Sequence, residues 1–187
     1  MRYLVAGLGN IGEKYRNTRH NIGFDLLDFI ARKESFQFGS GRYGMVAKHR
    51  IKNRLFFYIK PSTMMNLSGN AVRYWLNYLK LDEEQLMVVV DDIAIPFGSI
   101  RIRKKGGDGG HNGLSHIIQQ LGTGEFPRLR FGIGNDFPQG RQVDYVLSGW
   151  SEDQQKELDG RLGLAYDALK SWAFEGIEMA MTRYNKS

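Results

Sequence analysis

The chain has 187 residues, of which 42% are hydrophobic and 12% aromatic, and this composition predicts a packed globular protein rather than a disordered one. It contains no cysteine, which excludes disulfides and thiolate chemistry, and no apolar run suggests a signal peptide or a membrane span, so we expect a cytoplasmic protein. Lys and Arg outnumber Asp and Glu by 26 to 20, a net charge of +6, which favours polyanionic partners.

The first half of the chain predicts strands that alternate with helices. Residues 3–8 form an apolar run that ends at glycines, and residues 21–33 carry apolar side chains at helical spacing. Residues 44–51 and 54–60 are typical of a hairpin with a two-residue turn, whereas the polar, Gly-containing stretch 35–42 is typical of a loop.

The second half continues this alternation. Residues 69–79 and 112–121 are expected to be helices with one apolar face each. Residues 86–90 form a fully apolar strand, residues 99–104 alternate Ile with Arg, and residues 129–134 predict a further strand.

A helical region is expected to close the chain. It starts at a capping box between Ser151 and Gln154 and runs to about Tyr184. Three glycines are expected to weaken or divide it: Gly160, Gly163 and Gly176.

These elements predict an α/β fold: a single domain over residues 1–187, with a mixed, mostly parallel central sheet flanked by helices. Ligands of such sheets gather beyond the carboxyl ends of the strands. Asn10, Asp91 and Asp92 follow two of the predicted strands, so they outline a candidate site.

The stretch from Gly7 to Gly12 matches the glycine pattern of dinucleotide-binding proteins. That motif requires a helix to open at once and a second strand to end in an acidic residue about twenty positions on. Here the helix opens late, and Glu34 follows a helix instead of a strand. A dinucleotide-dependent enzyme is therefore the weaker alternative.

The four histidines differ in their surroundings. His49 lies in a predicted strand beside Lys and Arg and is interpreted as solvated or RNA-facing, and His116 lies in a helix and is interpreted as structural. His111, in a Gly-rich loop, could support a site. His20 stands just before a helix, and as an isolated histidine it would be interpreted as structural.

The polar residues at the same sheet edge favour a catalytic role for His20. An imidazole accepts a proton from water when a carboxylate on its other nitrogen fixes the tautomer. Asp91 or Asp92 could supply that carboxylate, and periodicity does not choose between them. The chain lacks zinc-type histidine spacing and a nucleophile-elbow serine, so water is the expected nucleophile and no metal or cofactor is expected.

Two basic stretches suggest RNA. Residues 100–107 place cations at a strand end before a glycine pair, and Arg128 and Arg130 share one strand face. Two guanidinium forks close together suit a phosphate group, although a solvated sheet surface is the alternative interpretation.

Three motifs occur in this order: residues 18–23 (Thr-Arg-His-Asn-Ile-Gly), 60–69 (Lys-Pro-Ser-Thr-Met-Met-Asn-Leu-Ser-Gly) and 109–114 (Gly-Gly-His-Asn-Gly-Leu). With these motifs the chain resembles the bacterial-type peptidyl-tRNA hydrolase family, and the resemblance extends over nearly the whole chain. The resemblance implies hydrolysis of the ester between a peptide and tRNA, with the acceptor stem and 3′ end of peptidyl-tRNA as partner. We expect a monomer. An RNA-binding protein without catalytic activity on the same fold is the competing class.

The resemblance also implies roles for individual residues. His20 matches the catalytic base, Asp91 the aspartate that orients it, and Asn10 an amide near the reacting group. The other matching positions are Tyr15, Met65, Asn66 and Asn112 for the substrate, and Arg103 and Arg130 for the tRNA 5′-phosphate. The chain departs from the family pattern at Ile11, where proline is usual, and at Ala94, where an acid is frequent.

Overall fold

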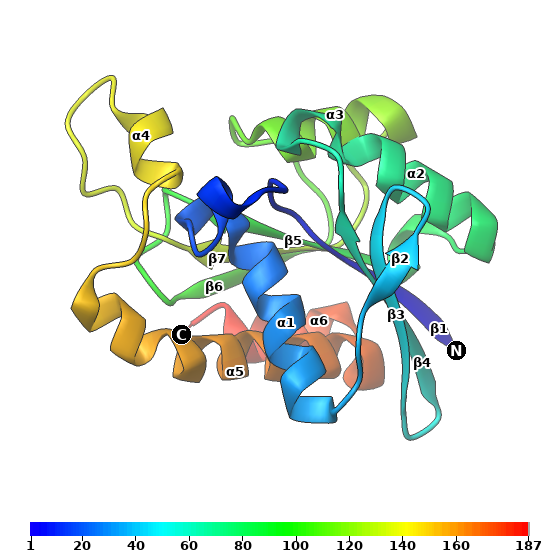
Figure 1. The fold of residues 1–187 in the computed structure, drawn as a ribbon. Coiled ribbons are helices and arrows are strands. Elements are labelled where there is room, and N and C mark those ends of the chain that lie inside the picture. Colours follow the sequence, from blue (N-terminus) through cyan, green and yellow to red (C-terminus); the bar gives the residue numbers. More distant parts are fainter. Residues whose placement is uncertain (187) are drawn as a thin grey trace.

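A mixed β-sheet forms the centre of the molecule (Figure 1). The computed structural model describes residues 1–186. Over these residues the sheet has seven strands in the order β2-β3-β4-β1-β5-β7-β6. They span β1 Arg2–Gly7, β2 Gly39–Gly41, β3 Gly44–Ile51, β4 Arg54–Pro61, β5 Leu86–Asp92, β6 Ile100–Arg103 and β7 Arg128–Gly132.

The four central strands, β4, β1, β5 and β7, run parallel to one another. The antiparallel pairs lie at the two edges, where β3 joins β4 and β2 on one side and β6 joins β7 on the other. The predicted mixed, mostly parallel sheet is therefore confirmed. The carboxyl ends of the parallel strands meet at one edge, where β1 and β5 deliver Asn10 and Asp91.

The prediction of a loop over residues 35–42 is wrong, because residues 39–41 form the short edge strand β2. All three of its residues are exposed. An edge strand without a buried face has no hydrophobic alternation, so the sequence gives no signal for it.

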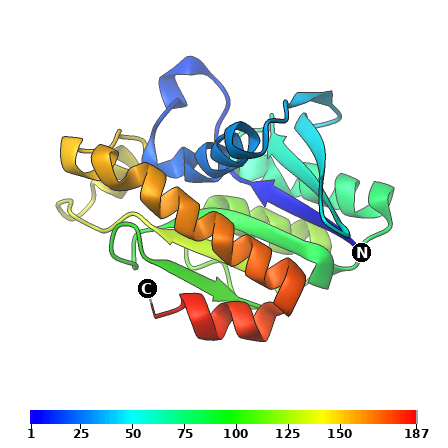
Figure 2. The ribbon, with the colours of Figure 1, turned by 90° about the horizontal axis from the view of Figure 1, so that it is seen from below.

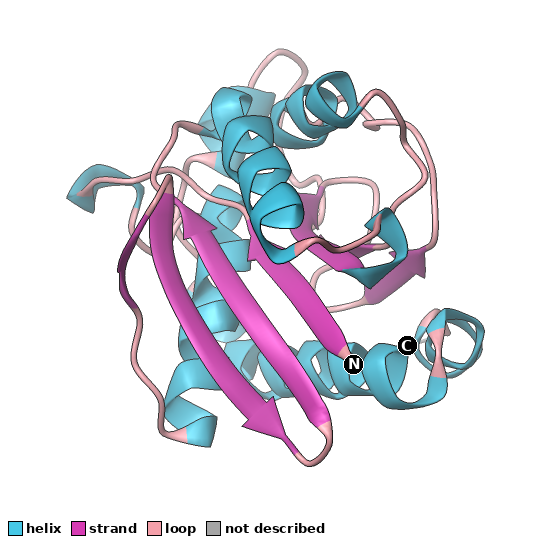
Figure 3. Cartoon of the chain, turned by 90° about the vertical axis from the view of Figure 1, so that its right-hand side faces the viewer, coloured by secondary structure: helices cyan, strands magenta, loops and turns pink. Residues whose placement is uncertain are grey.

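Helices cover both faces of the sheet (Figures 2 and 3). In chain order they are α1 Ile22–Glu34, α2 Ser68–Leu79, α3 Asn112–Leu121, α4 Gln142–Val146, α5 Glu152–Glu175 and α6 Ile177–Tyr184. Short 3-10 helices lie at Glu13–Tyr15, Arg19–Asn21, Met65–Leu67 and Glu83–Gln85.

Successive side chains of each central strand point to opposite faces of the sheet, so the hydrophobic core is divided between the two layers of helices. In β1, Tyr3 and Val5 belong to the cluster shared with α1, α5 and α6. Leu4 and Ala6 belong to the cluster shared with α2 and α3. Both faces of the central strands are buried, which explains why they read as continuous apolar runs.

The C-terminal helical region is confirmed, as is its capping box, because Ser151 Oγ accepts from Gln154 N–H and the Gln154 side chain accepts from Ser151 N–H. Of the three glycines expected to weaken or divide it, only Gly176 interrupts the helix, with φ of 97° between α5 and α6. Helix α5 continues through Gly160 and Gly163. Its buried side chains, Leu158 and Leu162 among them, outweigh the low helix propensity of glycine. None of the helices in residues 1–186 combines the length and apolar character needed to cross a membrane.

Candidate active site

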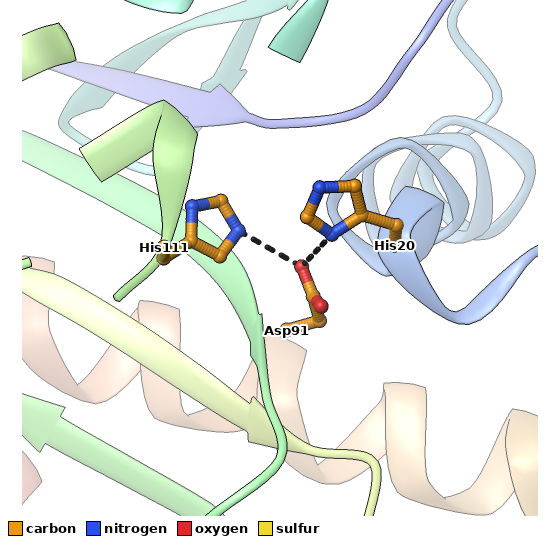
Figure 4. Close-up of side chains that lie close together, drawn as sticks. All are labelled: His20, Asp91 and His111. Carbon is orange, nitrogen blue, oxygen red and sulfur yellow. Dashed lines mark hydrogen bonds and ion pairs between the residues drawn. The ribbon is translucent and has the colours of Figure 1, made fainter. Parts of the chain in front are cut away.

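His20 and Asp91 meet at the carboxyl edge of the sheet (Figure 4). His20 lies in the 3-10 turn that precedes α1, and Asp91 lies near the end of β5. His20 Nδ1 is 2.8 Å from Asp91 Oδ1. The sequence did not decide whether Asp91 or Asp92 is the partner of His20, and the structure pairs His20 with Asp91. Asp92 faces elsewhere and contacts Arg130.

The segment that carries His20 is fixed by its buried neighbour Arg19. The Arg19 guanidinium donates to Ser148 Oγ and to the Gly149 carbonyl, and it lies 4.2 Å from the centroid of the Tyr145 ring. An isolated β-bridge between Thr18 and Gly149 reinforces the connection. The position of His20 therefore depends on residues about 130 positions later in the chain.

His111 is a second histidine that forms a hydrogen bond with the same carboxylate. Its Nδ1 accepts hydrogen bonds from the N–H groups of Gly113 and Leu114, at 3.1 and 3.3 Å, at the beginning of α3. The ring proton is therefore on Nε2, which donates to Asp91 Oδ1 at 2.9 Å. Sequence reasoning gave His111 only a general supporting role, and the structure places it in direct contact with Asp91.

Asp91 is buried, and burial alone would raise the pKa of its carboxyl. The hydrogen bonds and electrostatic interactions with His111 and His20 outweigh this effect and hold the pKa well below its usual range. Asp91 is consequently ionised at neutral pH. An ionised Asp91 accepts a hydrogen bond from His20 Nδ1–H. The ring proton of neutral His20 is then on Nδ1, so Nε2 keeps a free lone pair.

Asn10 is held by two neighbouring segments. Its backbone exchanges hydrogen bonds with the buried Asn21 side chain, each at 2.8 Å. Its Oδ1 accepts from Met65 N–H at 2.6 Å. Because Oδ1 is used in this way, Asn10 Nδ2 is the end of the amide that can donate to a ligand. Asn21 was not identified from the sequence.

Two hollows meet at His20. The larger, of about 360 Å³, extends over the Gly-rich loop 106–110. The smaller, of about 250 Å³, is lined by Asn10, Met65 and Asn66. His20 and Asn112 line both hollows, as do Val143 and Val146 of α4. Helix α4, which the sequence did not predict, therefore forms a wall of the site.

The larger hollow carries the predicted cationic residues. Arg103 and Arg130 both line it, and Arg130 Nε contacts Asp92 Oδ2. Arg128 lines it too, but this side chain is buried and donates to the carbonyls of Gly106, Gly107 and Gly124. Arg128 therefore supports the Gly-rich loop, and only Arg103 and Arg130 present guanidinium groups to a ligand.

Some of the residues considered from the sequence lie away from this centre. Tyr15 is half-buried on the turn before His20 and lines neither hollow. His49 is not a freely solvated side chain, because its ring stacks on Phe36 and contacts Glu34, and its orientation toward RNA stays a prediction. His116 is structural as expected, with its Nδ1 accepting from Gly69 N–H.

His20, Asp91 and His111 are also residue types that hold metal ions. The two backbone donors at His111 Nδ1 place a proton on Nε2, the nitrogen that faces Asp91, and a protonated nitrogen offers no lone pair to a metal. The geometry favours a hydrogen-bonded His–Asp–His group over a metal site.

Comparison with known proteins identifies the family of the chain. The family model described as peptidyl-tRNA hydrolase matches residues 4–187. This chain belongs to the peptidyl-tRNA hydrolase family. A peptidyl-tRNA hydrolase from Phocaeicola vulgatus is 53% identical over 186 residues, covering 100% of both chains. One from Clostridium botulinum is 45% identical over 98% of this chain and 96% of its own.

The fold agrees as well. The crystal structure of peptidyl-tRNA hydrolase from Acinetobacter baumannii superposes with a TM-score of 0.91 at 30% identity, covering 98% of this chain and 94% of that one. The fold class expected from the sequence motifs is therefore confirmed at the level of the family.

Proposed function

We propose that this chain hydrolyses the ester that joins a peptide to the 3′-terminal ribose of tRNA, with His20 as the general base, and so releases free tRNA. The observation that carries the mechanism is the His20–Asp91 hydrogen bond, which leaves His20 Nε2 as an acceptor where the two hollows meet. Membership of the peptidyl-tRNA hydrolase family supports the reaction itself.

The first step is the activation of water. His20 Nε2 takes a proton from a water molecule while the water oxygen attacks the carbonyl carbon of the ester. Asp91, which is ionised, stabilises the imidazolium that forms. The buried position of Asp91 strengthens this interaction because little solvent screens it.

The second requirement is a donor for the oxyanion that develops on the ester carbonyl. Asn10 Nδ2 and the Asn112 side chain both border the smaller hollow beside His20. Either amide, or a nearby backbone N–H, supplies the hydrogen bond that strengthens as negative charge develops. Asn66 and Met65 line the same hollow and position the substrate there.

The third step is departure of the ribose oxygen. The tetrahedral intermediate collapses, the carbon–oxygen bond to the ribose breaks, and the imidazolium of His20 returns its proton to that oxygen. The peptide leaves as a carboxylic acid and releases its proton to solvent, the tRNA leaves with its hydroxyl restored, and His20 is neutral again.

The cationic hollow accommodates the RNA. We assign Arg103 and Arg130 to the 5′-phosphate, since their guanidinium groups line the hollow on the Asp92 side of His20. We propose that the enzyme is a monomer built as one domain. We place the enzyme in the cytoplasm, where peptidyl-tRNA forms, and assign it no metal or cofactor.

The reaction and the assignment of Asp91 are tested together with purified protein and N-acetyl-aminoacyl-tRNA. Wild type should release free tRNA, and Asp91→Asn should lower kcat by about 10²-fold or more because His20 loses its charged partner. Asp92→Asn is the matched control, since it changes the adjacent carboxyl. It should retain kcat and raise KM through Arg130. Binding of tRNA without release by the wild type would instead identify a non-catalytic RNA-binding protein.

A further inference from the structure

A second hollow surface lies on α2, outside the candidate active site. A shallow depression of about 390 Å³ is lined by Tyr43, Asn70, Arg73, Tyr74, Asn77 and Tyr78. We call this surface the α2 face. In Figure 1 it belongs to the side of the molecule where α2 lies beside the turn that follows β2. Trp75 Nε1 donates to the Arg42 carbonyl at 2.8 Å, which fixes that turn against the helix.

The α2 face follows the smaller hollow of the active site along the chain. Asn66, which lines that hollow, lies in the 3-10 turn that leads directly into α2. Asn70, Arg73 and Asn77 follow at spacings of four, three and four, so they share one side of the helix with Asn66.

Exposed apolar side chains lie at both ends of this stretch. Met64 and Leu67 are 39% and 44% exposed, and Tyr78 at the far end is 65% exposed. Tyr78 stacks on Tyr74 with ring centroids 5.9 Å apart, so these two rings form an ordered apolar platform. Exposed apolar side chains that cluster within a polar rim are typical of a binding surface.

The charge distribution indicates which part of the substrate reaches this surface. The larger hollow holds the cations Arg103 and Arg130, which suit phosphate groups. The residues that line the smaller hollow include no Lys, Arg, Asp or Glu among those the structure describes. With the ester at His20 and the RNA on the cationic side, the peptide extends through the uncharged hollow.

We propose that the α2 face binds the peptide part of peptidyl-tRNA at residues remote from the ester. The proposal rests on the proposed function. Tyr74 and Tyr78 offer ring surface to apolar side chains, and Asn70, Arg73 and Asn77 offer donors to peptide carbonyls. The occupant is thus a peptide segment with apolar side chains.

The length of the track sets the peptide length that should benefit. Asn66 and Tyr78 are about 18 Å apart along the helix axis at a rise of about 1.5 Å per residue. An extended peptide spans this distance with about five residues. Substrates with one residue stop at the smaller hollow, and substrates with about eight residues cover the whole α2 face.

The test compares two substrates that share the same tRNA and the same esterified amino acid. One carries a single N-acetylated residue and the other an N-acetylated apolar peptide of eight residues. The variant Arg73→Ala/Tyr78→Ala removes two exposed side chains of the α2 face. The matched control is Lys156→Ala/Met179→Ala, which removes a cation and an apolar side chain from α5 and α6 on the opposite face of the sheet.

For wild type and control, we expect KM for the eight-residue substrate to be about tenfold lower than for the one-residue substrate. Arg73→Ala/Tyr78→Ala should reduce this difference to about twofold, with kcat and the one-residue KM unchanged.

The proposal is overturned if wild type shows no dependence on peptide length, or if the variant retains it. It is also overturned if the variant binds uncharged tRNA more weakly to the same degree, because RNA would then occupy the α2 face. Failure of wild type to release tRNA from either substrate would instead contradict the proposed function itself.

Discussion

Asp91 accepts hydrogen bonds from His20 and His111 through a single oxygen atom, and this arrangement makes His111 a positioning residue. Its Nδ1 is held by two backbone N–H groups, so its Nε2–H is aimed at Asp91 without rotamer freedom. We therefore propose that His111 contributes to catalysis by fixing the position of the Asp91 carboxylate, which in turn orients His20.

His111→Phe tests this role, because it keeps ring volume and removes both interactions. Loss of a donor to a buried charge should lower kcat by about tenfold, with KM for peptidyl-tRNA little changed. Steady-state kinetics with N-acetyl-aminoacyl-tRNA measure both constants. A variant with wild-type kcat would show that Asp91 is positioned without His111.

Asp25 on α1, away from the active site, makes the stability of the folded protein depend on pH. Burial, and then repulsion from Asp28, raises the pKa of its carboxyl to about 7, against the opposing charges of Arg32 and Lys60. The folded state therefore binds the proton more tightly than the unfolded state, and stability falls as pH rises from about 4 toward that value.

Asp25→Asn removes this titration. We expect the variant to gain about 1–2 kcal/mol of stability over wild type at pH 8, after allowance for partial solvent screening, and little at pH 4. Urea denaturation at both pH values measures the difference. Parallel stability curves for the two proteins between pH 4 and 8 would rule out an Asp25 titration.

The sequence alone identified the residue types of the site but not all of their contacts. Asp91 and Asp92 are adjacent, and only the packing of the layers decides between them. Asp91 continues the face of β5 that carries Met87 and Val89 and is covered by α1, the helix that follows His20. No local sequence pattern predicts which face of a strand a distant helix will cover. The sequence therefore did not decide which of the two aspartates contacts His20.

At the scale of elements, the approach of α1 to β1 fixes the distance between His20 and the sheet. A Cβ atom on Gly23 would lie 2.3 Å from Leu8 N, and one on Gly7 would lie 2.3 Å from Gly23 O. These two glycines let the helix begin directly against the end of the strand, which brings His20 within reach of Asp91.

Gly23→Ala should consequently destabilise the protein by about 2–3 kcal/mol, because backbone atoms must move to relieve the contact. The same shift should lower kcat by displacing His20. Gly160→Ala is the control: a Cβ there meets nothing within 4 Å, and alanine should stabilise α5 by about 0.5–1 kcal/mol. Thermal unfolding that ranks the two variants in the opposite order would contradict this packing.

Elements with a strong hydrophobic period were predictable, and elements without one were not. Helix α1 has a buried face that repeats at the helix period, and β4 buries Phe56 and Tyr58 at the strand period; the structure confirms both elements. Helix α4 has five residues and none of them is buried, so it offers less than two turns of periodicity. It was missed although Val143 and Val146 line the site.

At the scale of the whole molecule, the charges that we assign to RNA binding are concentrated in one hollow. Arg103→Ala/Arg130→Ala should weaken tRNA binding and reduce its salt dependence by about one unit of slope for each phosphate that the variant no longer neutralises. Hydrolysis of a short aminoacyl-ester fragment without the acceptor stem should be unchanged. Anisotropy measurements at several salt concentrations give the slope.

Lys156→Ala/Lys186→Ala removes the same charge from exposed positions elsewhere and controls for net charge. If this control reduces the slope as much as Arg103→Ala/Arg130→Ala does, the effect belongs to the overall charge and the phosphate assignment is wrong.

The family and the fold class were accessible from the sequence because three long motifs occur in order and the core strands are strongly apolar. The two hollows were not accessible in this way. Their walls combine residues from β5, β7, α3, α4 and the turn before α2, and this closure depends on long-range interactions such as that between Arg19 and Gly149. Tyr15, which the motifs place at the substrate, shows how a residue close in sequence to His20 can lie outside both hollows.

The central claim is that His20 activates water, and His20→Ala tests it most directly. In a single-turnover assay with peptidyl-tRNA, the rate of tRNA release should fall by about 10²–10⁴-fold, while the affinity for uncharged tRNA stays within about twofold of wild type. His49→Ala, which removes a histidine remote from Asp91, should retain the wild-type rate. Release of tRNA by His20→Ala at the wild-type rate would contradict the account.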